Sequence, residues 1–392
     1  MTELIWEKNI KITAADIPEF TEKIRFDGEF NQSISPGIFP DSLKSIIFGN
    51  KFNQPLSGNI LPDSLRHVEF GGNFNRSIAP GDLPNSLESI KFGYSFDQPI
   101  SENTLPNSLK SIIFGCEFDQ PIGFNVFPDN LEVVEFAWAF DQPIVENTLP
   151  NSVKSIVFGN HFNQPIGKNV LPNSLNSIIF GSYFNQPIEP DVLPKSLESI
   201  VFGYDFNQPL VPNVFPDSLE YVVFGRMFNK PIEPNVLPKS LKSIVFGLAF
   251  NQPIRENVLP VHLKYIAYMG TYNHPITAIY NLSHIEHISI LTGHPIEINI
   301  GLLPPSLKYL YISNKDMLVS LNTESQRMWF SVIFTGPLVL FDITYMMLWV
   351  SQQSYNDGYK VIGTDTVDGK EYVKLINPVH YQPRSNAKSA RK

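Results

Sequence analysis

Five of the eight histidines lie within residues 262–294, a density that could indicate a metal site. They are His262, His274, His284, His287 and His294. Imidazole nitrogens are common zinc ligands. However, two of these histidines precede Pro-Ile where other segments read Gln-Pro-Ile, and His262 stands where others have serine. We interpret the cluster as variation within a repeated pattern and expect neither a metal ion nor a cofactor.

Nucleophilic side chains give no stronger indication of chemistry. The only cysteine is Cys116, so no disulfide can form within the chain, which favours a reducing compartment. A serine recurs at Ser42, Ser64 and onward just before each expected strand, where it suits backbone hydrogen bonding. No phosphate-binding loop, dinucleotide fingerprint or H-E-x-x-H motif occurs. We therefore expect an intracellular, cytoplasmic protein that is not an enzyme.

Apart from His284 and His287, these residues belong to a 22-residue repeat that covers most of the chain. The string FNQPI, or a close variant, starts at Phe30 and returns every 22 residues up to Tyr272, twelve times in all. A second aromatic residue stands four residues before each start. Such regular self-similarity is typical of solenoids, in which each coil contacts only its neighbours.

Each unit also has the apolar spacing L-x-x-L-x-L, as in Leu43, Ile46 and Phe48, which is the leucine-rich-repeat pattern. It predicts a β-rich, leucine-rich-repeat-like solenoid with one short parallel strand per repeat. We expect a strand over Ser45–Gly49 with Ile46 and Phe48 pointing inward, and Phe52 closing the next turn into the core.

The residue after the second aromatic is Asn or Asp in all twelve copies. Twelve equivalent positions cannot form one catalytic site, but a short side chain can bind turn backbone. Because Asn and Asp share only an acceptor oxygen, we predict that this oxygen forms a structural ladder beside the aromatic columns. The proposed members include Asn53, Asp97, Asn163, Asn185, Asn207, Asn251, Phe48, Phe52, Phe158 and Phe162.

The outward face of the strands is where the copies differ most. At the middle outward position of the strands, the first half of the chain has a mixture that includes charged residues. The second half has β-branched residues there. An exposed apolar strip beside Tyr and Arg is typical of a partner site, although β-branched residues also suit parallel strands and the C-terminal segment could cover them. The candidate partner-binding residues are Val157, Ile179, Val201, Val223, Val245, Tyr204, Tyr221, Arg226 and Leu248.

Composition narrows the partner class. The formal net charge is −9 over 392 residues, with 17% charged and 43% hydrophobic residues. This excludes a disordered acidic chain and argues against binding to nucleic acid or a membrane surface. The expected partner is a protein.

The unit LPxSLKSIxFGxxFNQPI resembles the FNIP repeat, a leucine-rich-repeat variant of social amoebae and of giant viruses that infect amoebae. The resemblance covers about residues 17–313 and implies an interaction scaffold, with a possible role between virus and host. Several relatives carry an F-box before the repeats and are presumed ubiquitin-ligase adaptors. Only residues 1–16 precede the repeat here, so substrate recognition for a ubiquitin ligase is the weaker alternative.

Both ends depart from the repeat. We expect residues 1–16 to form an N-terminal cap through Trp6, Ile10 and Ile12, residues 17–313 the solenoid, and residues 314–392 a C-terminal cap or small module with a basic tail. That module should hold a helix near 323–335 and a hairpin around Asp368–Gly369. The apolar stretch Met328–Val350 favours a buried cap over a membrane anchor, and an unrecognised enzymatic role of this module stays an alternative.

Overall fold

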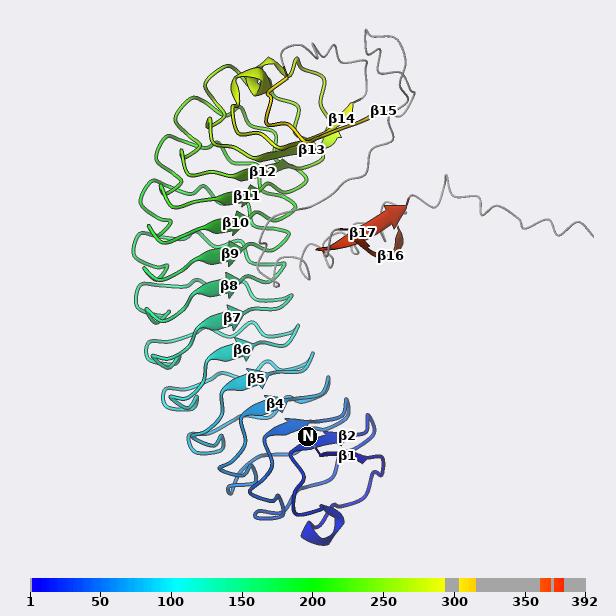
Figure 1. Cartoon of the computed structure of the whole chain (residues 1–392). Helices are drawn as coiled ribbons and strands as arrows, with labels where there is room; N and C mark the ends of the chain where they lie inside the picture. The colour runs from blue at the N-terminus through cyan, green and yellow to red at the C-terminus, as the bar shows by residue number, and fades with distance from the viewer. Residues whose placement is uncertain (1, 293–302, 315–359, 368–369, 377–392) are drawn as a thin grey trace, which may run out of the picture. The chain divides into compact units, whose positions relative to one another are not determined.

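The computed structural model describes residues 2–292, 303–314, 360–367 and 370–376. The chain divides into two compact units, Met1–Arg327 and Met328–Lys392. The first unit contains a parallel sheet whose fifteen strands follow one another in sequence order (Figure 1). The strands are β1 (Glu3–Trp6), β2 (Lys23–Phe26), β3 (Ser45–Ile47), β4 (His67–Glu69), β5 (Ser89–Lys91), β6 (Ser111–Ile113), β7 (Val133–Glu135), β8 (Ser155–Val157), β9 (Ser177–Ile179), β10 (Ser199–Val201), β11 (Tyr221–Val223), β12 (Ser243–Phe246), β13 (Tyr265–Thr271), β14 (His287–Thr292) and β15 (Tyr309–Asn314).

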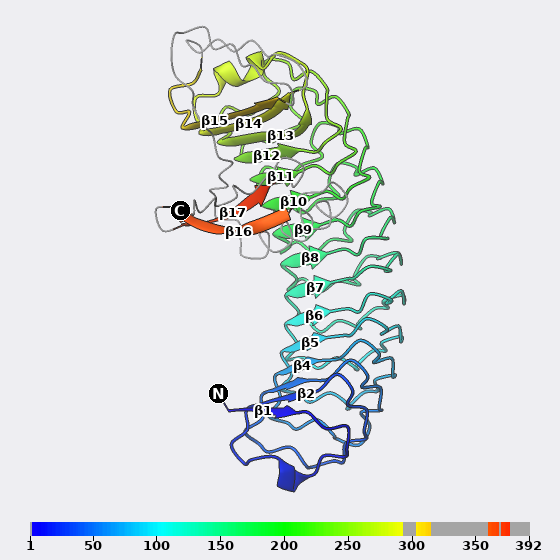
Figure 2. The same ribbon diagram turned by 90° about the vertical axis from the view of Figure 1, so that its right-hand side faces the viewer.

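The predicted solenoid with one strand per repeat is confirmed. From β2 to β13 each strand pairs with the next at an offset of 22 residues, for example Ser199 with Tyr221 and Ile200 with Val222. The sheet lies on the concave side of the curved stack, and turns form the opposite side (Figures 1 and 2). Inward residues such as Ile46 and Phe48 are buried, as period-two alternation requires.

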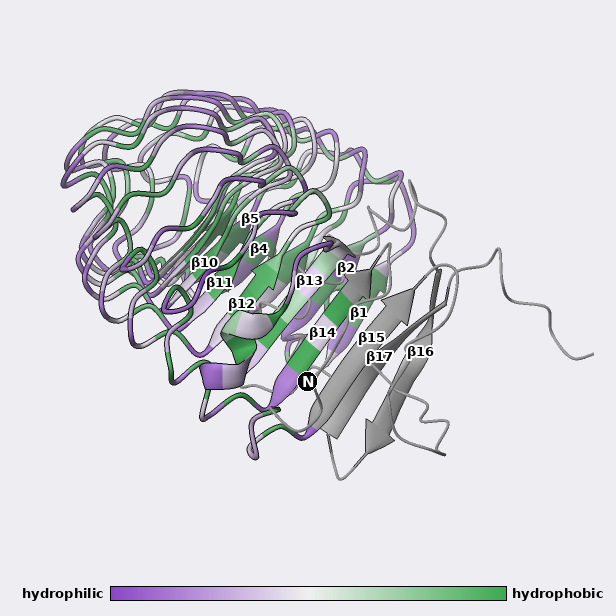
Figure 3. Cartoon of the chain, turned by 90° about the horizontal axis from the view of Figure 1, so that it is seen from above, coloured by the Kyte–Doolittle hydropathy of each residue, from purple (hydrophilic) through white to green (hydrophobic). Residues whose placement is uncertain are grey.

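Two columns of phenylalanine rings run through the core. Within a coil the two rings stack with centroids 4.0 Å apart, as between Phe158 and Phe162. Each ring also stacks on its equivalent in the next coil, with Phe162 and Phe184 6.1 Å apart. Viewed along the stack, the strands carry much of the hydrophobic colour (Figure 3). Burying one such ring stabilises the fold by about 1.5–3 kcal/mol.

The turns opposite the sheet contain a column of left-handed residues that the sequence analysis missed. Nine of its members have φ between 55° and 67°, a region that asparagine and aspartate tolerate and that β-branched residues avoid. Gly37 and Gly81 occupy the same column. Its other members are Asn59, Asn103, Asn125, Asn147, Asn169, Asp191, Asn213, Asn235 and Asn257.

The N-terminal segment covers the first coil differently from our expectation. Trp6 and Ile12 are buried, but Ile10 is 56% exposed, so the prediction that Ile10 caps the core is wrong. The Ile10 carbonyl lies 3.4 Å from the indole nitrogen of Trp6, which holds the backbone while the side chain faces solvent. Two short 3-10 helices, η1 (Ala14–Asp16) and η2 (Thr277–Asn281), are the helical elements of the described residues.

The second unit contains the antiparallel strands β16 (Lys360–Val367) and β17 (Lys370–Ile376), drawn in orange and red in Figure 2. They agree with the predicted hairpin. Its turn at Asp368–Gly369, the expected helix and the apolar stretch Met328–Val350 lie outside the described residues. Among the residues that are described, no helix has the length and apolar character needed to cross a membrane.

Candidate interaction face

The asparagine and aspartate column links each coil to the next. From Asn31 to Asn251, the Oδ1 atom of each residue accepts the backbone N–H of its equivalent one repeat later, at 2.8–3.1 Å. In many coils the residue after the donating N–H is Gln, and its side-chain amide often donates to the same oxygen. Gln208, which follows Asn207, donates in this way to Oδ1 of Asn185 at 3.1 Å. The column begins one coil before the first FNQPI string, where Asn9 accepts the N–H of Asn31. These residues therefore satisfy backbone between coils and are part of the framework.

The recurrent serine also connects coils. Its hydroxyl donates to a backbone carbonyl 21 residues earlier at 2.6–2.8 Å, as Ser64 does to Leu43. The serine hydroxyls thus bind backbone as expected, but the backbone belongs to the preceding coil and not to their own turn. These hydroxyls are therefore engaged in holding adjacent coils together.

Charged residues form a row just before the strands on the concave face. Arg66, Glu88 and Lys110 make a chain of ion pairs across three coils, and Lys110 Nζ lies 3.0 Å from Glu88. The hydrogen bond from Lys110, followed by that from Arg66, lowers the pKa of Glu88. Further pairs join Lys154 to Glu132 and Lys242 to Glu220. Most of this row is therefore occupied by contacts within the molecule.

The row is interrupted over the middle of the sheet. Before β9 it contains the uncharged Asn176, and before β10 it contains Glu198, which makes no ion pair within the part of the chain that the structure describes. The same two strands carry Ile179 and Val201 at the middle outward position. By contrast, β4 and β5 carry Glu69 and Lys91 there, joined by an ion pair of 2.7 Å. The central strands thus offer an apolar surface without charges paired across it.

The apolar strip is less exposed than the sequence indicated. Val157, Ile179 and Val245 are buried, whereas Val201 and Val223 are half-buried. In-register pairing places each of these side chains beside its equivalents on the two neighbouring strands. The expectation of an exposed strip is therefore wrong at Val157, Ile179 and Val245, and Val201 and Val223 are its accessible members.

Aromatic and cationic residues lie at the border of the strip. The Arg226 guanidinium is 5.3 Å from the centre of the Tyr204 ring, within the range of a cation–π contact. Both residues and Leu248 are half-buried. Tyr221 stands at the first outward position of β11, where desolvation, followed by the charge of Glu220, raises the pKa of its phenol. The structure therefore brings Tyr204, Tyr221 and Arg226 to the same few coils as Val201 and Val223.

The turn that follows the strands holds exposed aromatic residues that the sequence analysis did not select. Trp138 and Tyr183 are each 48% exposed, and the ring of His161 lies between them at 5.8 Å and 5.2 Å. Their positions vary freely between copies, which was the available signal. They extend the variable surface along one edge of the concave face.

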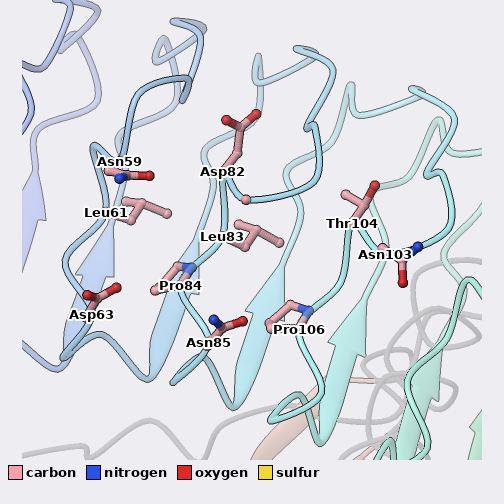
Figure 4. A pocket seen from close by; sticks show the side chains of 11 residues that line it. Asn59, Leu61, Asp63, Asp82, Leu83, Pro84, Asn85, Asn103, Thr104 and Pro106 are labelled. Atoms are coloured by element: carbon pink, nitrogen blue, oxygen red, sulfur yellow. The ribbon is translucent and has the colours of Figure 1, made fainter.

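A polar cleft of about 180 Å³ opens in the segments that lead toward β4, β5 and β6 (Figure 4). Asn59, Asp82 and Asn103 line it, together with Thr104, whose hydroxyl is buried and lacks a hydrogen-bond partner in the structure. Thr148 has the same unpaired hydroxyl two coils later and does not line the cleft. Thr104 and Thr148 occupy the same repeat position, which is mostly valine in the other coils. The buried hydroxyl therefore belongs to that repeat position and gives the cleft no chemistry of its own.

Fold and repeat together define a leucine-rich-repeat-like solenoid. The chain belongs to the FNIP Repeat family, whose model matches residues 9–51, 52–95, 96–137, 140–183, 184–226 and 228–267. The resemblance noted in the sequence is thereby confirmed. No curated protein matches the chain.

One solved structure with a similar sequence shows the same architecture. CroV588, a circular leucine-rich-repeat protein of a giant virus, is 42% identical with a TM-score of 0.68, over 76% of this chain and 47% of CroV588. The chain thus spans less than half the length of that protein. A chain of the Drosophila Toll–Spätzle complex is 12% identical over 80% of this chain and 43% of its own, with a TM-score of 0.48. YopM from Yersinia enterocolitica is 15% identical over 80% and 73%, with a TM-score of 0.39.

Proposed function

We propose that this chain is a non-enzymatic scaffold that binds a protein partner through the concave strand face between β8 and β12. The contact would centre on Val201 and Val223, with Tyr204, Tyr221 and Arg226 at its border. We place this binding in the cytoplasm, where the single Cys116 stays reduced. The family and its solenoid fold are consistent with a binding role, and no residue reported above forms a catalytic arrangement.

One observation carries the proposal: the gap in the ion-pair row, over β9 and β10, falls within the apolar strip that runs from β8 to β12. Over β9 and β10 the concave face has apolar residues in the middle and no ion pair beside them within the described residues. Apolar surface with aromatic and arginine neighbours is typical of interface centres. Because hydrogen bonds and stacked rings hold every coil, the face is already ordered and binding loses little conformational entropy.

The double substitution Val201→Asp with Val223→Asp tests this function. Both positions are half-buried and outward, so charges there should remove partner binding while the inward core stays intact. Proteins captured from the native cell by the wild-type chain are identified by mass spectrometry, and their recovery is compared between variants. We expect recovery of the principal partner to fall at least about tenfold, the effect of ~1.4 kcal/mol.

Ile113→Asp is the matched control, because Ile113 occupies the same outward position on β6, away from the proposed face. It should capture the same partner as the wild type. Circular dichroism spectra must show that all variants stay folded. Undiminished recovery by the double variant, or an equal loss with Ile113→Asp, would reject the proposed face.

A further inference from the structure

Two consecutive coils replace the recurrent serine by histidine. The column is serine at Ser218 and Ser240, becomes His262 and His284, and returns to serine at Ser306. Both histidines are exposed, and their ring centroids lie 4.8 Å apart at an interplanar angle of 58°. Because serine returns in the next coil, the change is not a simple decay of the column toward the C-terminus.

The surroundings of His284 identify the ring nitrogen that is free to bind a ligand. Its Nδ1 atom lies 3.3 Å from the Val261 carbonyl oxygen and 2.9 Å from the Ser283 hydroxyl oxygen. The carbonyl can only accept a hydrogen bond, so Nδ1 must carry the proton. Its N–H then donates to the Val261 carbonyl, and the Ser283 hydroxyl oxygen can accept from it as well. Nε2 then keeps its lone pair. Histidines that bind metals commonly have this arrangement, with one nitrogen donating to a backbone carbonyl and the other facing the metal.

We propose that His262 and His284 together bind one divalent transition-metal ion of the group that prefers imidazole, Cu²⁺, Ni²⁺ or Zn²⁺. Metal–nitrogen distances of about 2.0–2.1 Å require the two ligating nitrogens to approach to roughly 3 Å, which rotation of the exposed His262 ring toward His284 allows. No third His, Cys, Asp or Glu completes a metal-binding group within the described part of the chain. Water therefore fills the remaining positions, and the affinity is lower than that of a four-ligand structural site.

Among the described residues, His274 and His287 do not belong to this pair, and His294 lies outside them. His274 stands in the ladder's glutamine position, where its Nε2 lies 2.9 Å from the Asn251 carbonyl. His287 is buried on β14. The sequence-based interpretation of the cluster as repeat variation thus suits His274, whereas we infer a metal pair at His262 and His284. This inference does not depend on the proposed partner face.

Titration of the untagged full chain with Cu²⁺ tests the pair. Calorimetry measures the affinity, and electron paramagnetic resonance reports the nitrogen ligands. His262→Ser and His284→Ser each restore the residue that the column has elsewhere, so the fold should be kept. We expect one Cu²⁺ bound with two nitrogen ligands in the spectrum. Each substitution should weaken binding about tenfold or more, because the second ligand no longer acts at high effective concentration.

His274→Gln is the control, since it restores the ladder residue and leaves the pair intact. It should bind Cu²⁺ as the wild type does. Zn²⁺ should displace Cu²⁺ when in excess, and Mg²⁺ should not, because Mg²⁺ prefers oxygen ligands. Unweakened Cu²⁺ binding in either serine variant, a one-nitrogen spectrum in the wild type, or an equal loss in His274→Gln would overturn the proposal.

Discussion

A single side-chain oxygen can serve two donors in the next coil. Oδ1 of Asn163 accepts the backbone N–H of Asn185 at 2.9 Å and the side-chain amide of Gln186 at 3.2 Å. Loss of a buried acceptor leaves its donors without partners and costs the desolvation of those groups. The column is therefore restricted to residues that carry an oxygen at this distance from the backbone.

Asn163→Ala should lower the free energy of unfolding by about 1–3 kcal/mol, because the Asn185 N–H loses its acceptor. Asn163→Asp keeps the oxygen and should lower the free energy of unfolding much less, because Asp119 and Asp141 already occupy equivalent positions. Urea unfolding followed by circular dichroism measures both. An unfolding midpoint that Asn163→Ala leaves in place would show that the ladder is dispensable.

The strand elements could be predicted from sequence because their determinants recur in every copy. Ile46 and Phe48 point inward as period-two alternation indicated, and Phe52 reaches the core. The strand ends at Ile47, two residues earlier than predicted, because the Gly49 carbonyl closes a turn with the Phe52 N–H at 3.1 Å. The left-handed conformation of Asn169 was missed, because asparagine is common in turns of several kinds and only backbone angles distinguish them. Val157 is buried and Val201 is half-buried although both hold the same strand position, so the local pattern could not predict this difference.

The coils also approach each other closely at one glycine column after the strands. A Cβ atom built on Gly203 would lie 1.7 Å from the Gly181 carbonyl oxygen, and the neighbouring column members meet the same obstacle. The obstacle is backbone, which cannot rotate away as a side chain could. One coil accommodates alanine, Ala137, so a shift of the backbone is possible at some cost.

Gly203→Ala should therefore destabilise the protein by about 1–3 kcal/mol, the usual cost of an overpacked site. Gly72→Ala is the matched control at an adjacent turn position, because its Cβ would meet no atom closer than 3.8 Å. Thermal unfolding of the two variants measures the difference. Equal melting temperatures would mean that the coils separate without penalty.

Across the whole molecule, the shifted pKa values predict how stability depends on pH. Ion pairing with Lys110 lowers the pKa of Glu88, and the hydrogen bond from Lys308 lowers that of Glu286. Desolvation lowers the pKa of His287, opposed by Glu286. A group whose pKa is lower in the folded state binds protons more readily when unfolded. Each of these groups therefore stabilises the fold at neutral pH and loses that contribution on acidification.

We expect the melting temperature to fall in two stages as the pH decreases. The first stage begins below about pH 6.5, the ordinary value of histidine, and the second below about pH 4.5, that of glutamate. His287→Ser, which places the common residue of that strand position on β14, should reduce the first stage and leave the second. Calorimetric melting curves between pH 3 and pH 8 provide the measurement. A first stage of unchanged size in His287→Ser would assign it to another group.

The constant offset of 22 residues between bonded ladder members has a consequence for the gene. Because every coil offers its successor the same acceptors and the same ring surface, a duplicated or deleted block of 22 codons leaves two compatible coils in contact. Recombination between copies can therefore change the length of the array without creating a misfolded junction. Substitutions at outward positions such as Val201 can then diversify each added copy independently of its framework.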